Sequence, residues 1–191
     1  MKKVISFINV TLDGFCDHTA MIADDELHQN ANALLSITDT ILFGRITYQL
    51  MEEGWPPIVK NPTGNKPTDE FAVLIEKVSK LVFSHTLERV DWKNARLARQ
   101  DIKEEVMQLR QSPGDAGKII LVGSPSLIIT LMQLGLIDEY RFCVHPVILG
   151  KGLPLFRNIK EQINLTLIQT QRHQSGAVTV YYEPAEKEKR N

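Results

Sequence analysis

The chain has few cysteines, almost no net charge and no long apolar run. Cys16 and Cys143 have neither CxxC nor Cys/His partner spacing, so disulfide and metal frameworks are not expected. The formal net charge of −1 provides no bulk attraction to nucleic acid or to an anionic membrane. No stretch reaches the roughly 20 apolar residues of a membrane-spanning helix, and Asn9, Thr11 and Asp13 interrupt the first apolar segment too early for a secretory signal. These absences favour a cytoplasmic protein in a reducing compartment.

What remains is the composition of an ordinary globular protein. Hydrophobic residues make up 43% of the 191-residue sequence and charged residues 24%. A domain of this length buries about 70% of the surface that its unfolded chain exposes, so it needs no disulfide or metal to fold. We expect one domain over residues 1–184 and a solvated tail over residues 185–191.

The apolar pattern alternates between strands and helices and finishes in a hairpin. Expected strands occupy residues 4–11, 40–43, 81–84, 95–99, 118–123, 139–144, 163–173 and 177–183. Expected helices occupy residues 24–35, 46–51, 69–78, 101–111 and 126–134, and the proline-rich residues 55–67 are expected to form a loop. This order predicts an α/β fold: a central mixed, mostly parallel sheet with helices on both faces and a C-terminal antiparallel hairpin.

Phosphate-binding chemistry follows the second predicted strand. The chain runs into Gly44, Arg45 and Thr47 at a helix start, where free amides, a planar guanidinium and a hydroxyl can together hold a phosphate. The same residues also suit an ordinary strand-to-helix turn with a surface arginine, so this turn alone does not decide between the two.

Two further strand ends carry small and polar residues. The fifth predicted strand leads into a turn that contains Gly123, Ser124, Pro125, Ser126 and Leu127. Ser124 suits an N-cap and Pro125 the first helical position, so a capped helix that binds nothing explains this turn as well. Ser84, His85 and Thr86 follow the third strand and suit either a phosphate contact or a polar loop. Together the three turns favour an elongated ligand with several phosphates, such as a dinucleotide.

Five segments occur in a distinctive order and spacing along the chain. They are TLDG (11–14), FGRITYQ (43–49), FSHT (83–86), LVGS (121–124) and DEYRFCVHPVILGKGLPLF (138–156). In this order they resemble the dihydrofolate-reductase-like superfamily. More narrowly, the chain is similar to the branch that contains the C-terminal reductase domain of bacterial riboflavin biosynthesis proteins, and the likeness runs from about residue 3 to residue 183.

The resemblance implies a three-layer fold, an NADPH-dependent reductase activity and a homodimer. It also implies cofactor contacts at positions that match the three turns and the first-strand loop, namely Leu12, Gly44, Arg45, Thr47, Ser84, His85, Thr86, Gly123, Ser124, Pro125, Ser126 and Leu127. His145, Lys151 and Gly152 match a segment that the riboflavin-type reductases use near the substrate.

The chain departs from the family pattern in three places. Ser124 stands where the family usually has the second of two adjacent glycines. True dihydrofolate reductases place a pterin-binding carboxylate on the first helix, and counting back from Gly44 finds His28 near that position, which argues against folate. Riboflavin enzymes are usually fused to a zinc deaminase, and the H-x-E…P-C-x-x-C signature does not occur in this sequence.

Hydride transfer to a C=N or C=O bond also needs a proton source. Asp13 is the candidate catalytic acid because it lies in the first-strand loop, although Asp-Gly is also a common turn. His28, His145, Lys151 and Gly152 are candidate substrate residues, since a histidine titrates near neutrality and a lysine suits an anionic group.

Three functions stay open on the sequence. The favoured one is an NADPH-dependent reductase of a small heterocyclic or carbonyl substrate; the others are a true dihydrofolate reductase and a non-catalytic NADPH-binding dimer. The apolar final strands, INLTLIQT and AVTVYY, favour a homodimer because a monomer would leave them poorly covered. No metal, nucleic-acid partner or membrane is expected.

Overall fold

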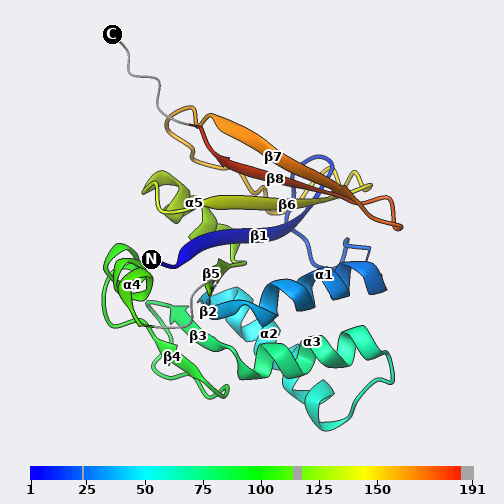
Figure 1. Ribbon diagram of the computed structural model, residues 1–191, viewed down its shortest axis with the longest axis vertical. Coiled ribbons are helices and arrows are strands. Elements are labelled where there is room, and N and C mark those ends of the chain that lie inside the picture. The colour runs from blue at the N-terminus through cyan, green and yellow to red at the C-terminus, as the bar shows by residue number, and fades with distance from the viewer. Residues whose placement is uncertain (23, 114–117, 186–191) are drawn as a thin grey trace.

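A single sheet forms the middle layer of the computed structural model, which describes residues 1–22, 24–113 and 118–185 (Figure 1). Within these residues the strand order is β4-β3-β2-β5-β1-β6-β8-β7. The strands are β1 (Lys3–Thr11), β2 (Thr38–Gly44), β3 (Ser79–Phe83), β4 (Ala95–Leu97), β5 (Ile119–Val122), β6 (Glu139–His145), β7 (Leu165–Arg172) and β8 (Val178–Pro184). The helices are α1 (Asp25–Ser36), α2 (Arg45–Lys60), α3 (Lys66–Lys77), α4 (Ile102–Gln111) and α5 (Pro125–Gln133).

The sheet has the mixed, mostly parallel character that the sequence predicts. The strands from β4 to β6 pair in parallel along the order above. Strand β8 then pairs antiparallel with both β6 and β7. The predicted α/β fold class, a mixed and mostly parallel sheet with a C-terminal antiparallel hairpin, is therefore confirmed.

Two apolar clusters hold the layers together, one on each face of the sheet. Because side chains of a strand alternate between faces, Val4 and Ile8 of β1 join the cluster under α4 and α5, with Ile128 as a fully buried member. Ile5 of the same strand joins the other cluster, under α1, α2 and α3, with Leu35 of α1. Helices thus cover both faces, as predicted.

The predicted loop over residues 55–67 is too long, because only residues 61–65 lie outside helices. Helix α2 continues through Pro56 and Pro57 to Lys60, and α3 already begins at Lys66. Each proline removes a backbone donor, which ordinarily ends a helix. Here the ring of Trp55 packs against Phe71 of α3 with a centroid distance of 4.3 Å, and this contact between the two helices favours the extra turns.

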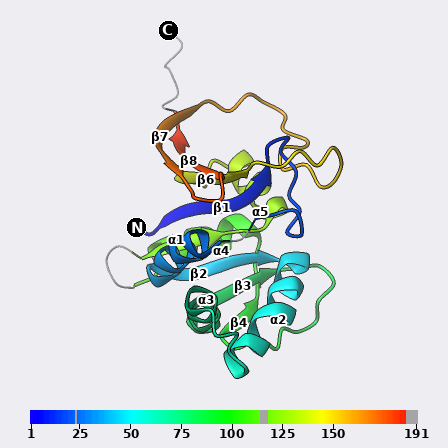
Figure 2. The same ribbon diagram turned by 90° about the vertical axis from the view of Figure 1, so that its right-hand side faces the viewer.

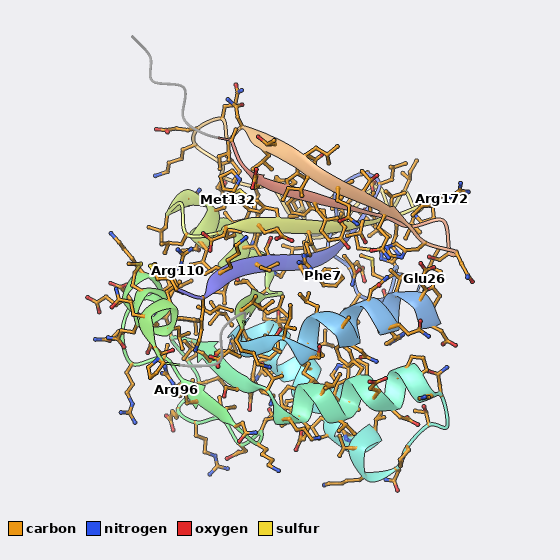
Figure 3. The ribbon with its side chains drawn as sticks, viewed as in Figure 1. Phe7, Glu26, Arg96, Arg110, Met132 and Arg172 are labelled. Carbon is orange, nitrogen blue, oxygen red and sulfur yellow. The ribbon has the colours of Figure 1, made fainter. Side chains whose placement is uncertain are left out.

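The C-terminal hairpin turns at Ser175–Gly176, as predicted, and Gly176 has the positive φ of 85° that a glycine tolerates. Its tip lies on the start of α1: Gln174 N donates to Glu26 Oε2 at 2.9 Å. Figure 3 shows Glu26 and Arg172, at the end of β7, on the same side of the molecule. Residues 186–191 of the predicted solvated tail lie outside the described residues.

Candidate functional site

The predicted site residues gather along one edge of the sheet. Parallel strands end at the same edge, so the segments after β3, β2, β5, β1 and β6 form a row in that order. Along the row lie Ser84, His85 and Thr86, then Gly44, Arg45 and Thr47, then Gly123 to Leu127, then Leu12, Asp13 and Gly14, and last His145, Lys151 and Gly152. Such a row at the carboxyl ends of strands is the usual ligand edge of an α/β sheet.

The strand order creates a topological switch point in the middle of this row, here termed the crevice. The chain passes from β1 outward to β4 and then returns to β5, which lies between β2 and β1. Helix α2, after β2, packs with the cluster on one face, whereas α5, after β5, packs on the other. The two helices therefore diverge from neighbouring strands, which is the topological switch point where such sheets bind ligands.

Three helices away from this crevice have their first turns closed by side chains. The N-cap residues of α1, α3 and α4 are Asp24, Asn65 and Asp101, whose oxygens accept from Leu27 N, Thr68 N and Glu104 N at 2.7, 3.0 and 2.9 Å. Each of these first turns also carries an acidic residue. Their free amides and positive dipole ends are thus satisfied within the protein.

Helices α2 and α5 lack both features. Their N-cap residues, Gly44 and Ser124, make no side-chain cap hydrogen bond, and neither first turn contains an acidic residue. The first-turn amides of a helix attract anions when no side chain occupies them. Two such helix starts face the crevice from adjacent strands, and this suits a ligand with neighbouring phosphates.

The hydroxyl of Ser124 joins these two turns instead of capping its own helix. Its Oγ accepts a hydrogen bond from Gly44 N at 2.9 Å, and Ser124 is buried. Ser124 therefore occupies the N-cap position of α5, as expected, but its hydroxyl does not cap the helix because it accepts from Gly44 N. A Cβ on Gly44 would lie 3.3 Å from Ser126 Oγ, which explains why glycine stands at this close approach. No peptide bond of the described residues is cis.

A cavity of about 490 Å³ lies farther along the row, between α2 and the segment after β3. Thr86 lines it, and so does Gln49, a residue that the sequence interpretation missed. Arg45 is exposed and donates through Nη1 to Gln49 Oε1 at 3.2 Å. Because residues four apart share a helix face, the spacing of Arg45 and Gln49 could have identified this second residue.

Asp13 accepts hydrogen bonds at the other end of the row. Thr11 Oγ1 donates to its Oδ1 at 2.6 Å, and Gly150 N donates to its Oδ2 at 2.7 Å. Leu149 N also donates to the carboxylate, at 3.1 Å. These hydrogen bonds, led by that of Thr11, lower the pKa of Asp13 to about 2. The carboxyl is ionised at neutral pH and has no proton to donate, which argues against the acid role considered for it.

His145 is buried and uses both ring nitrogens within the protein. Its Nδ1 accepts from Ile22 N at 3.2 Å, so the ring proton is assigned to Nε2, which donates to Asn9 Oδ1 at 3.2 Å. Burial and the nearby His173 lower the pKa of His145. With 1% of its surface exposed, this neutral ring orders the start of α1 and cannot reach a ligand directly.

The remaining predicted residues differ in position. Lys151 is exposed between Gly150 and Gly152, both with positive φ. His28 lies on α1, where its ring packs edge-on against Trp55 and Phe71 with centroid distances of 6.4 and 6.2 Å. It is the one candidate residue that lies in a helix interior and not in a segment that directly follows a strand. Among the described residues, no group of three or more His, Cys, Asp and Glu side chains could hold a metal ion, and no helix could cross a membrane.

The sequence model of the RibD C-terminal domain matches residues 2–179. The chain belongs to this family. YyaP of Bacillus subtilis, an uncharacterized protein, is 36% identical over 186 residues, which cover 95% of this chain and 94% of YyaP. YwjB of the same organism, also uncharacterized, is 24% identical over 187 residues, covering 95% of this chain and 97% of YwjB.

Solved structures agree with this assignment at the level of fold. A protein of Shewanella sp. PV-4 assigned to riboflavin biosynthesis has a TM-score of 0.72 and 18% identity, covering 96% of this chain and 99% of its own. A diaminohydroxyphosphoribosylaminopyrimidine deaminase/5-amino-6-(5-phosphoribosylamino)uracil reductase of Thermotoga maritima has a TM-score of 0.64 and 17% identity, covering 96% of this chain and 57% of its own. Membership in the RibD C-terminal domain family supports an oxidoreductase of the riboflavin-biosynthesis type.

Proposed function

We propose that the protein is an NADPH-dependent reductase that transfers a hydride to a small heterocyclic or carbonyl substrate. The observation that carries the proposal is the pair of uncapped helix starts, α2 and α5, on adjacent strands at the crevice. Their amides suit the pyrophosphate of a dinucleotide. NADPH supplies the hydride when bound, and the protein supplies the binding, the orientation and the exclusion of competing reactions.

The row of residues fits the parts of such a cofactor in sequence. Gly44, Thr47 and the turn from Gly123 to Leu127 would hold the pyrophosphate, and Arg45 would pair with the 2′-phosphate. Ser84, His85 and Thr86, beside the cavity after β3, would contact the adenosine end. Leu12 and the loop around it would then border the nicotinamide, with Lys151 and Gly152 near the substrate.

We assign the proton for the reduced substrate to a group other than Asp13 or His145. Asp13 is ionised, and its carboxylate already accepts from Thr11, Leu149 and Gly150. His145 is buried, with both ring nitrogens engaged. We therefore assign proton transfer to an ordered water, which is a sufficient source for this chemistry.

Folate is disfavoured as the substrate, because the carboxylates at the start of α1 are already engaged. Asp24 caps α1 and also accepts from Ser175 N at 3.1 Å. Asp25 accepts from Asn65 Nδ2 at 2.9 Å, and Glu26 accepts from Gln174 N. None of these carboxylates is left free as the counter-charge that a protonated pterin needs.

A homodimer in the cytoplasm completes the proposal. Strand β7 is an edge strand whose Leu167 and Ile168 are 53% and 51% exposed, and an exposed apolar edge of this kind favours pairing with another chain. A second copy of this chain would cover it. Light scattering at micromolar concentration is expected to give the mass of a dimer, and a monomeric mass would contradict the assignment.

Thermal unfolding with added nucleotide tests the function. NADPH at about 100 times its Kd should stabilise the fold by about 2.7 kcal/mol, and NADH should require higher concentrations for the same shift. Oxidation of NADPH with a panel of heterocycles and carbonyl compounds then separates a reductase from a non-catalytic binding protein. An unfolding temperature that neither nucleotide changes would contradict the proposal.

A further inference from the structure

The loops after β1 and β6 form one structural unit, here termed the paired loops (residues 12–16 and 146–155). Backbone hydrogen bonds join them in three places: Leu12 N to Val147 O at 2.8 Å, Cys16 N to Leu153 O at 2.8 Å, and Leu155 N to Gly14 O at 2.9 Å. Figure 2 shows the segment after β1 beside the long connection between β6 and β7. The paired loops are therefore positioned together rather than independently.

Asp13 is the polar centre of the paired loops. Its carboxylate accepts from both Leu149 N and Gly150 N, 136 and 137 residues away in the chain. Thr11 Oγ1, at the end of β1, donates to the same carboxylate and accepts from Phe15 N at 3.0 Å. Without this carboxylate two amides of one loop would lose their acceptor, and the contact with the other loop would weaken.

The paired loops expose large apolar side chains at the sheet edge. Ile148 is 75% exposed, Leu12 63% and Leu153 39%. Ile22, 40% exposed, is held beside them because its amide donates to His145 Nδ1. Isolated apolar side chains on a surface are ordinary, but several gathered at the end of a ligand row indicate a binding surface.

The paired loops contain few charged residues. In the paired loops, all of whose residues are described, Asp13 and Lys151 are the acidic and basic residues. The carboxylate of Asp13 is engaged by the loop amides, which leaves Lys151 as one exposed ammonium. Bidentate recognition of a phosphate draws on arginine, and the paired loops contain no arginine; Lys151 is the one charged donor that they offer to a ring carbonyl oxygen.

We propose that Asp13 is a positioning residue that holds the paired loops so that Leu12, Ile148 and Leu153 form an apolar wall for an uncharged ring substrate. This inference rests on the proposed function, because the wall lies at the end of the row assigned to the nicotinamide. The substrate class that follows is a neutral, flat ring compound without a phosphate group.

A matched pair of probes tests the wall. 2-Naphthol and 2-naphthyl phosphate share one ring system and differ in charge, and each is titrated into the protein with and without saturating NADP⁺, with binding measured by calorimetry. In both conditions 2-naphthol is expected to bind about tenfold more tightly than the phosphate. Ile148→Ser is expected to weaken the binding of 2-naphthol about fivefold, because it removes part of the apolar wall.

Variants of the two loop aspartates separate positioning from general stability. Asp13→Ala is expected to weaken the binding of 2-naphthol about fivefold. Asp13→Asn is expected to recover part of this loss, because its Oδ1 still accepts a hydrogen bond from one loop amide. Asp17→Ala is the matched control, since Asp17 accepts from Thr19 within its own loop and not from residues 146–155. The Kd of NADP⁺ should stay unchanged in Ile148→Ser and Asp17→Ala.

Three results would overturn the inference: equal or tighter binding of 2-naphthyl phosphate, no binding of either probe, or an Asp13→Ala variant with wild-type affinity for 2-naphthol. If Asp13→Ala does not fold, Asp13→Asn and Ile148→Ser decide the matter by the same comparison. Failure of the proposed function would instead appear as no binding of NADP⁺, which is a separate titration.

Discussion

Helices α1, α3 and α4 begin differently from α2 and α5. The first three are closed by Asp24, Asn65 and Asp101, with acidic residues in their first turns. The other two begin at Gly44 and Ser124, with neither a side-chain cap hydrogen bond nor an acidic first turn. Capping stabilises a helix by about 1 kcal/mol, so two adjacent starts without it are consistent with amides kept open for an anion. A local rule of helix formation is broken where a ligand is expected.

The largest expected effect comes from giving α5 the acidic first turn that the other helices have. Ser126 is exposed in that first turn, so Ser126→Asp should leave the fold intact and stabilise the helix by about 0.3–1 kcal/mol. The same charge should repel the pyrophosphate and raise the Kd of NADPH about 100-fold, which is about 2.7 kcal/mol. Fluorescence titration and urea unfolding measure the two effects.

Ser126→Asn is the control for this change, because it has nearly the same shape without the charge. It should bind NADPH within about threefold of the wild type. If Ser126→Asp binds NADPH as tightly as Ser126→Asn, the start of α5 does not contact the phosphates.

The next effect concerns the cationic side chain at the start of α2. Removing the guanidinium in Arg45→Ala should weaken the binding of NADPH by about 2 kcal/mol, which is the usual size of a charge-assisted contact. The affinity for NADH should stay nearly unchanged. Arg99→Ala is the control, since Arg99 is an exposed arginine that follows β4 and lies outside the turns assigned to the cofactor. Equal losses of affinity for NADPH and NADH would show that Arg45 does not bind the 2′-phosphate.

A smaller effect is expected at a closed helix start. Asp101→Ala removes the acceptor of Glu104 N in α4 and should lower the free energy of unfolding by about 1 kcal/mol. The Kd of NADPH should not change, because α4 lies away from the crevice. A raised Kd of NADPH in a folded Asp101→Ala variant would contradict the distinction between helix starts that only stabilise the fold and helix starts that bind the ligand.

The smallest effect concerns the loop amides that Asp13 satisfies. Its pKa is about 2 in the folded protein against 3.8 for the ordinary group, so its ionised form stabilises the fold above about pH 4 and this contribution is lost as the pH falls through about 2. The urea midpoints of wild type and Asp13→Asn should differ at pH 7 and converge between about pH 4 and 2. A constant difference across this range would mean that the carboxylate charge does not stabilise the loops.

Local signals in the sequence predicted most of the fold. The strands, the helix that became α1 and the hairpin turn at Gly176 depend on periodicity and on residues within a few positions of one another. The continuation of α2 through Pro56 and Pro57 was missed because it depends on the packing of Trp55 against another helix. Local propensity is overridden there by a tertiary contact.

The candidate site was predicted in its residues but not in its contacts. The turns at Gly44 and Gly123 were found from their composition, and the sheet order brings them together. The partner of Ser124 is 80 residues away, and the partners of Asp13 are 136 and 137 residues away. No pattern of neighbouring residues encodes such pairs, so the roles of Ser124 and Asp13 had to come from the structure.

A crystal structure of the protein with NADPH would show directly whether the two uncapped helix starts bind the cofactor. The pyrophosphate is expected within hydrogen-bond distance of first-turn amides of both α2 and α5, with the 2′-phosphate on Arg45. A pyrophosphate bound elsewhere, with both helix starts facing only water, would contradict this expectation.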